Sequence, residues 1–159
     1  MFNYTDIQNA TIYHVDSHWY SDNKFVNAIM GIESGHIAYA YNTMSGAKGL
    51  FQFVSSTAQY YNLKDAYDPH QSLKAFKKLT ADNIRVLLKS GIPVTPVNIY
   101  LCHQQGAGGF KKLYKHINCG APISETLLRN IKNNSLGGFK SVKQFYADWE
   151  ARITREMNK

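Results

Sequence analysis

The carboxyl group best placed to do chemistry is that of Glu33. Apolar residues recur at helical spacing from Phe25 to Ile32, which predicts a short helix over about residues 23–33 with one apolar face. Gly35 can supply the left-handed residue that ends this helix. Glu33 then lies where the apolar face runs out, and desolvation by apolar neighbours favours a protonated carboxyl that can act as an acid. The same pattern also fits the alternative that Glu33 is an ordinary solvated glutamate in the last turn of a helix.

A polar loop and a compact apolar run follow the predicted helix. The loop from Gly35 to Gly46 holds Tyr39 and Tyr41, and Leu50–Val54 is the only strand-like run in the chain. Gln52 is the one amide within that run. A buried glutamine must find hydrogen-bond partners, so we expect it either to tie two loops together or to present its amide to a ligand.

The rest of the chain predicts helices with recognisable starts and ends. Asp68-Pro69 is a strong start signal, because Asp caps a helix and Pro is tolerated at its first position. Thr95 and Ser141 are expected to cap later helices, and the glycine cluster Gly106–Gly109 is expected to separate two of them. Further predicted helices cover about residues 55–61, 70–89, 96–105, 110–116 and 124–131, with a last one after Ser141. The fold class is therefore mainly α, in one domain over residues 1–159.

Composition limits the classes of partner. The net charge of +7 and the pI of about 9.4 favour an anionic partner, but the basic residues are scattered rather than gathered in one arm. Cys102 and Cys119, with His103 and His116, lack the close pairs typical of zinc sites. The glycine cluster lacks the spacing of a phosphate-binding loop. We expect no metal, no nucleotide, no nucleic acid and no integral membrane association.

Four short motifs follow one another in the chain. They are Glu33-Ser34-Gly35, Gly49-Leu-Phe-Gln-Phe53, Asp68-Pro69-His70-Gln71-Ser72-Leu73 and Gly106-Ala-Gly-Gly109. In this order and spacing they resemble a soluble lytic transglycosylase domain of the lysozyme-like superfamily. The pattern of that family is Glu-Ser, Gly-Leu-Met-Gln, Asp-Pro-x-Gln-Asn-Ile and Ala-Tyr-Asn-Ala-Gly. Each motif alone is weak, whereas the ordered set is strong.

The chain departs from that pattern at several positions. Phe51 replaces the usual Met, and Ser72-Leu73 replaces Asn-Ile. His103-Gln104 stands where the family has Tyr-Asn. Either His103 has taken over the role of the family tyrosine, or Tyr100, one turn earlier on the same predicted helix, supplies the phenol. The His variant is similar to the peptidoglycan-degrading domains of bacteriophage particles.

The resemblance implies chemistry with a single glutamate and no organic cofactor. Glu33 would protonate the glycosidic oxygen between N-acetylmuramic acid and N-acetylglucosamine, and the N-acetyl group of the substrate would stabilise the positive centre. Glu33 would then take a proton from the muramic C6 hydroxyl, which closes a 1,6-anhydro ring. Ser34 would orient Glu33. The other implied substrate-binding residues are Gln52, Tyr100, His103, Gln104, Tyr39 and Tyr41.

The resemblance also implies an architecture and a setting. We expect a lysozyme-like fold with a minimal β element near residues 35–54, a motif core over about residues 23–116, and C-terminal helices over residues 122–157 packed on it. The expected partners are peptidoglycan glycan strands and the tail or other proteins of a phage particle. The first residues have no signal-peptide pattern, so we expect a virion-associated protein or one delivered to the periplasm and cell wall by another machine.

Three other functions fit parts of the sequence. A hydrolase of the lysozyme type would use the same Glu33 with attack by water, for which Asp65 is a candidate holder. A catalytically silent lysozyme-like module could bind the wall or serve a larger assembly, although the intact Glu33, Ser34 and Gln52 argue against it. A small basic nucleic-acid-binding protein is disfavoured by the scattered charges.

Overall fold

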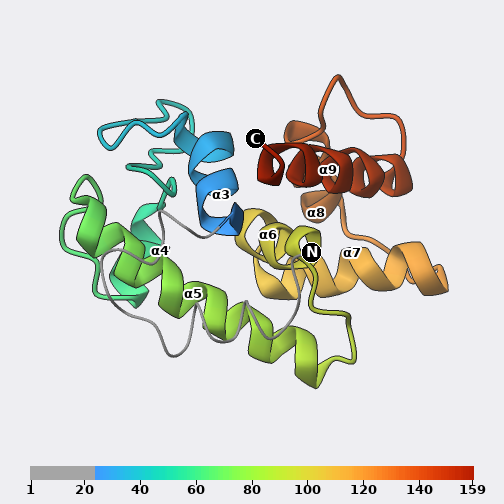
Figure 1. Ribbon diagram of the computed structural model, residues 1–159. Helices are drawn as coiled ribbons and strands as arrows, with labels where there is room; N and C mark the ends of the chain where they lie inside the picture. The colour runs from blue at the N-terminus through green and yellow to red at the C-terminus, as the bar shows by residue number, and fades with distance from the viewer. Residues whose placement is uncertain (1–23) are drawn as a thin grey trace. The chain divides into compact units, whose positions relative to one another are not determined.

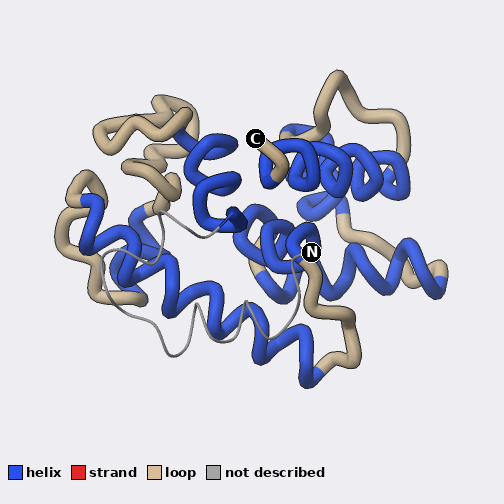
Figure 2. Tube along the Cα trace, viewed as in Figure 1, coloured by secondary structure: helices blue, strands red, loops and turns tan. Residues whose placement is uncertain are grey.

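The computed structural model describes residues 24–159, and the described chain is mainly helical (Figures 1 and 2). The helices are α3 (Lys24–Ser34), α4 (Ser55–Tyr60), α5 (Pro69–Lys89), α6 (Pro96–Gln105), α7 (Ala107–Cys119), α8 (Glu125–Asn133) and α9 (Val142–Met157). The prediction of a mainly α, lysozyme-like fold is confirmed. No described helix has both the length and the apolar character needed to cross a membrane.

The described residues form two compact units. The first unit contains residues 24–82 together with Glu156–Lys159, and the second contains Asn83–Arg155. The single domain over residues 1–159 and the packing of its C-terminal helices stay predictions. The amphipathic turns that the sequence suggests within residues 1–22 lie outside the described residues.

Three phenylalanines form the aromatic centre of the first unit. Phe51 stacks on Phe76 of α5 with ring centroids 4.2 Å apart and planes 12° from parallel, and Phe25 of α3 lies 6.4 Å from Phe76. All three rings are buried. Aromatic pairs of this kind contribute about 0.5–1.5 kcal/mol beyond the burial of their area. Phe51, which replaces the family methionine, therefore joins α3 and α5 through the loop between them.

The β element between α3 and α4 is minimal, as predicted. Lys48 forms isolated antiparallel bridges with Tyr41 and with Phe53. The strand-like run predicted over Leu50–Val54 is wrong in detail, because Leu50, Phe51 and Gln52 form a turn and only Phe53 pairs. Gln52 has a φ of 52°, a left-handed conformation that an extended strand does not contain.

A close backbone approach fixes the loop on the start of α5. Gly49 has a φ of 81°, and a Cβ placed on it would lie 1.9 Å from the carbonyl oxygen of Ala66. That carbonyl accepts a hydrogen bond of 2.6 Å from the hydroxyl of Ser72, which is fully buried. Only glycine combines this conformation with this proximity. Ser72, a departure from the family Asn, thus holds the segment against which Gly49 packs.

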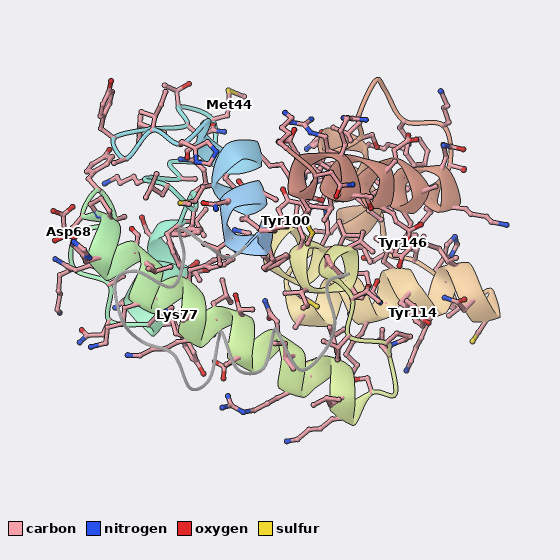
Figure 3. The ribbon with its side chains drawn as sticks, viewed as in Figure 1. Met44, Asp68, Lys77, Tyr100, Tyr114 and Tyr146 are labelled. Carbon is pink, nitrogen blue, oxygen red and sulfur yellow. The ribbon has the colours of Figure 1, made fainter. Side chains whose placement is uncertain are left out.

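The start of α5 follows the predicted capping pattern. Oδ1 of Asp68 accepts hydrogen bonds from the backbone N–H groups of His70 at 2.9 Å and Gln71 at 3.3 Å. The Gln71 side chain donates to Oδ2 at 3.2 Å. These hydrogen bonds lower the pKa of the Asp68 carboxyl from its ordinary 3.8, and the largest contribution comes from the backbone N–H of Gln71. Figure 3 shows Asp68 at the first turn of α5.

Capping residues also begin three helices of the second unit, α6, α8 and α9. The hydroxyls of Thr95, Ser124 and Ser141 each accept a backbone N–H, which confirms the caps expected at Thr95 and Ser141. The glycine cluster behaves differently from its prediction. Gly106, with a φ of 75°, is the only break, because α7 already begins at Ala107 and includes the next two glycines.

We predict that Gly49→Ala destabilises the protein far more than Gly46→Ala. Gly46 also has a positive φ, of 74°, but a Cβ there would meet nothing within 4 Å. Gly46→Ala should therefore cost about 1 kcal/mol of unfolding free energy, from backbone strain alone. Gly49→Ala adds a clash with the Ala66 carbonyl and should cost about 2–4 kcal/mol. Urea denaturation measures both values, and equal losses would contradict the close approach.

A second prediction concerns the pH dependence of the α5 cap. Because folding lowers the pKa of Asp68, its ionised form stabilises the native state above the ordinary value of 3.8, and this contribution is lost as pH falls through the lowered pKa. Asp68→Asn keeps a capping oxygen but does not titrate. The parent should therefore be more stable than Asp68→Asn at pH 7, and the difference should disappear in acid. Thermal unfolding across this pH range would reveal a constant difference if the cap carried no charge effect.

Candidate active site

Glu33 lies in the last turn of α3 and is half-buried. The chain reverses directly after it, because Gly35 and His36 both have left-handed φ values of 61° and 63°. The N–H of Gly35 donates to the Gly31 carbonyl at 3.1 Å, and that of His36 donates to the Met30 carbonyl at 3.2 Å. The first bond pairs one of the last four carbonyls of the helix, which have no partner within it, and the second gives the Met30 carbonyl a further donor. The carboxyl-bearing residue is thus part of a well-defined helix end.

Ser34 connects that helix end to the apolar loop. Its hydroxyl lies 3.0 Å from the Met30 carbonyl oxygen, within α3, and 2.9 Å from the Leu50 carbonyl oxygen, sixteen residues along the chain. A serine hydroxyl has one hydrogen, so these two acceptors share it. The sequence predicts that Ser34 orients Glu33. The observed bonds give it a defined way to do so, since they fix the helix end on the Leu50 segment.

Gln52 joins two parts of the loop through its side-chain amide. Nε2 donates to the Gly49 carbonyl at 3.0 Å and to the Ala40 carbonyl at 3.4 Å. The loop-tying role that the sequence suggested is therefore present. Both bonds use the NH₂ group, and within the described residues no donor is bonded to Oε1. A fixed amide with a remaining acceptor can receive an N–H group from a ligand.

Tyr39 and Tyr41 lie on the loop that follows Glu33, and both are exposed, with 79% and 55% of their surface accessible. Figure 3 shows the neighbouring Met44 at the outer edge of the same loop. Exposed tyrosines on a loop can stack on the apolar face of a sugar ring. Neither ring belongs to the buried core of the first unit.

The other predicted site residues belong to α6 in the second unit. Tyr100 is 3% exposed, and its ring lies 5.1 Å from that of Trp149 and 6.2 Å from that of His103. His103 and Gln104 are partly exposed, and Oε1 of Gln104 accepts a hydrogen bond of 2.9 Å from Gln105. Of the two candidates for the missing family tyrosine, Tyr100 is thus a core ring and His103 reaches the surface.

The aspartates near the loop have structural tasks. Oδ1 of Asp65 accepts the N–H of Tyr67 at 2.9 Å, and Asp68 caps α5. The hydrolase alternative would require Asp65 to hold water, and one of its carboxylate oxygens is already engaged.

Within residues 24–159, no three His, Cys, Asp or Glu side chains gather as they would to hold a metal ion.

The family model of the Transglycosylase SLT domain matches residues 11–93, just over half of the chain. The chain belongs to this family. Membership assigns it peptidoglycan lytic transglycosylase activity in general and peptidoglycan as its substrate. No curated protein matches the chain. The match includes Glu33, Ser34 and Gln52 of this SLT domain, but it ends before α6, where Tyr100, His103 and Gln104 lie.

Two residues that support the site of this SLT domain were not singled out by sequence reasoning. Gly49 and Ser72 together place the loop that carries Gln52. Gly49 was visible as the first residue of the Gly49–Phe53 motif and Ser72 as a departure from the family pattern, but neither was given a role. Their importance depends on the Ala66 carbonyl, whose position no local pattern reveals.

We predict that Ser34→Ala loosens the connection between α3 and the Leu50 segment. Removing the hydroxyl leaves the Leu50 carbonyl without this donor, which should cost about 1–2 kcal/mol of unfolding free energy. Ser55→Ala is the matched control, because Ser55 is exposed at the start of α4 and should change stability by less than about 0.5 kcal/mol. Urea denaturation compares the two, and a Ser34→Ala loss as small as that of the control would contradict the connection.

Proposed function

We propose that this SLT domain cleaves the β-1,4 bond between N-acetylmuramic acid and N-acetylglucosamine, with Glu33 as its single acid and base, and releases 1,6-anhydro-muramic acid products. The observation that carries the proposal is the family match over residues 11–93, within which Glu33 stands at the end of α3 beside the loop tied down by Ser34. The step is a transfer within the glycan strand, so no water is consumed.

Two proton transfers at one carboxyl group make up the proposed reaction. The protonated Glu33 gives its proton to the glycosidic oxygen as the bond to the muramic C1 breaks, and the N-acetyl oxygen of the same sugar stabilises the positive centre at C1. The Glu33 carboxylate then takes the proton of the muramic C6 hydroxyl, whose oxygen bonds to C1. The carboxyl is protonated again at the end, which is the requirement for turnover with one group.

The use of the other acids in the first unit supports a mechanism with one glutamate. Asp65 and Asp68 accept backbone N–H groups. Asp82 accepts the hydroxyl of Tyr61 at 2.7 Å, and Glu156 pairs with Lys159 at 2.9 Å. A glycosidase that uses water or a covalent intermediate generally needs a second carboxylate. Asp65, Asp68, Asp82 and Glu156 therefore all take part in contacts within the first unit.

The proposed binding roles follow from the positions of the polar groups. Oε1 of Gln52 can accept the N–H of a sugar N-acetyl group, because Nε2 is held by the Gly49 and Ala40 carbonyls. Tyr39 and Tyr41 offer exposed rings to the strand. The roles of Tyr100, His103 and Gln104 in holding the substrate, the place of the enzyme in a phage particle and its delivery to the cell wall stay predictions.

We predict that Glu33→Gln keeps the fold and loses wall degradation. An amide can neither donate nor recover the proton, so release of soluble muropeptides should fall by at least about a hundredfold. The measurement is mass spectrometry of muropeptides released from purified peptidoglycan, alongside thermal unfolding of the same sample. Glu150→Gln, on the exposed surface of α9, is the matched control and should retain the parent rate.

The same spectra separate the reaction types. Products that end in 1,6-anhydro-muramic acid support the proposal. Reducing-end products, heavier by one water, would make the protein a hydrolase and overturn the anhydro step while keeping Glu33 as the acid. A folded Glu33→Gln variant that releases muropeptides at the parent rate would overturn the assignment of Glu33.

A further inference from the structure

Two exposed tyrosines and a lysine lie together on the first unit. Tyr41 and Lys48 are paired in an antiparallel bridge, and Nζ of Lys48 lies 5.9 Å from the centre of the Tyr67 ring. We refer to these three residues as the Tyr41–Lys48–Tyr67 patch. Tyr41 is 55% exposed, Tyr67 is 38% exposed, and Lys48 is also exposed.

The backbone geometry brings the side chains of Tyr41 and Lys48 to one face. The N–H of Asn42 donates to the Ala47 carbonyl at 2.9 Å, and the N–H of Gly49 donates to the Ala40 carbonyl at 2.9 Å. Tyr41 and Lys48 are therefore the non-hydrogen-bonded pair of this bridge, the kind in which opposite side chains lie closest. An aromatic ring and an ammonium group thus stand side by side on the loop.

Tyr67 is held beside them by a separate turn. Oδ1 of Asp65 accepts the N–H of Tyr67 at 2.9 Å, so the segment before α5 is fixed locally. The Lys48 ammonium lies over the Tyr67 ring at a distance typical of cation–π contacts. Within residues 24–159, no carboxylate forms an ion pair with Lys48. The ammonium is therefore positioned by aromatic contact and is accessible to an anion from solution.

The chemistry of the patch selects a ligand with both apolar surface and a carboxylate. In a peptidoglycan strand the sugars are uncharged where the lactyl group is joined to a peptide by an amide bond. The carboxylates of such a strand lie on its peptide stems, next to the methyl groups of alanine. The exposed rings of Tyr41 and Tyr67 suit the apolar groups, and the ammonium of Lys48 between the two elements suits the carboxylate.

We propose that the Tyr41–Lys48–Tyr67 patch binds the acidic peptide stem of the glycan strand and makes the enzyme favour strands that carry stems. This inference rests on the proposed function, because it names a specificity determinant for the same substrate. None of the three side chains takes part in the proton transfers proposed for Glu33. The patch therefore acts on substrate choice and leaves the chemistry at the glycosidic bond unchanged.

The test compares two substrates and two lysine variants. The substrates are purified glycan strands with their stems and the same strands after an amidase has removed the stems, which leaves a free lactyl carboxylate on each muramic acid. Lys48→Met removes the charge and keeps an apolar side chain of similar length. Lys78→Met, at an exposed position of α5, is the control for loss of one positive charge.

We expect Lys48→Met to lower kcat/KM on stem-bearing strands by about two- to fivefold, the effect of one exposed ion pair. The same variant should leave turnover of stem-free strands unchanged, and Lys78→Met should leave both unchanged. The difference in kcat/KM between the parent and Lys48→Met on stem-bearing strands should shrink at high salt, because the ion pair is exposed. Lys48→Arg should restore the preference, which also guards against a folding defect in Lys48→Met.

Each contrary outcome overturns a different statement. If Lys48→Met and Lys78→Met had equal kcat/KM values on stem-bearing strands, the patch would not bind the stem and this inference would be overturned. The proposed function would still stand if the parent enzyme were active. An equal loss on both substrates would show that Lys48 binds the lactyl carboxylate or the sugar, and would overturn the assignment to the stem. A parent enzyme that releases nothing from either substrate would overturn the proposed function itself.

Discussion

The contact between Gly49 and the carbonyl of Ala66 is the constraint on which the rest of the site loop depends. A side chain at position 49 would meet that oxygen at 1.9 Å, so the loop can pack on the segment before α5 only through glycine. The polar groups of Gly49 are used as well, since its N–H donates to Ala40 and its carbonyl receives the Gln52 amide. Ser72 holds Ala66 in turn. One close approach thus sets both the turn that carries Gln52 and the position of the loop relative to α5.

The helices of this chain could be predicted because their signals are local. Asp68 and Thr95 cap the next turn with their own side chains, and the caps were evident from residue type and position alone. The turn over Leu50–Gln52 could not be predicted, because the compact apolar run favoured a strand there. The left-handed conformation of Gln52 is maintained by bonds to Gly49 and Ala40, and no local preference of glutamine indicates it.

The candidate site shows the same division between local and distant information. The place of Glu33 at a helix end followed from the apolar spacing before it and the glycine after it. The partner of Ser34 could not be foreseen, because Leu50 lies in another segment and any of several carbonyls was equally suitable. The burial of Tyr100 against Trp149 depends on α9, far along the chain. Sequence motifs therefore identified the residues, whereas their contacts required the fold.

The single catalytic carboxyl that we propose would place a demand on the rest of the first unit that its structure helps to meet. Proton donation and recovery at one group work only if the group returns to the same position after the bond breaks, so the helix end must stay fixed between the two transfers. Ser34 binds that end to Leu50, Gly49 binds the loop to Ala66, and Phe51 stacks the loop on α5. A second carboxylate would relax this demand, because one group could act as the acid and the other as the base or nucleophile. The several contacts that fix this one loop are therefore the structural counterpart of the chemistry that we propose for one glutamate.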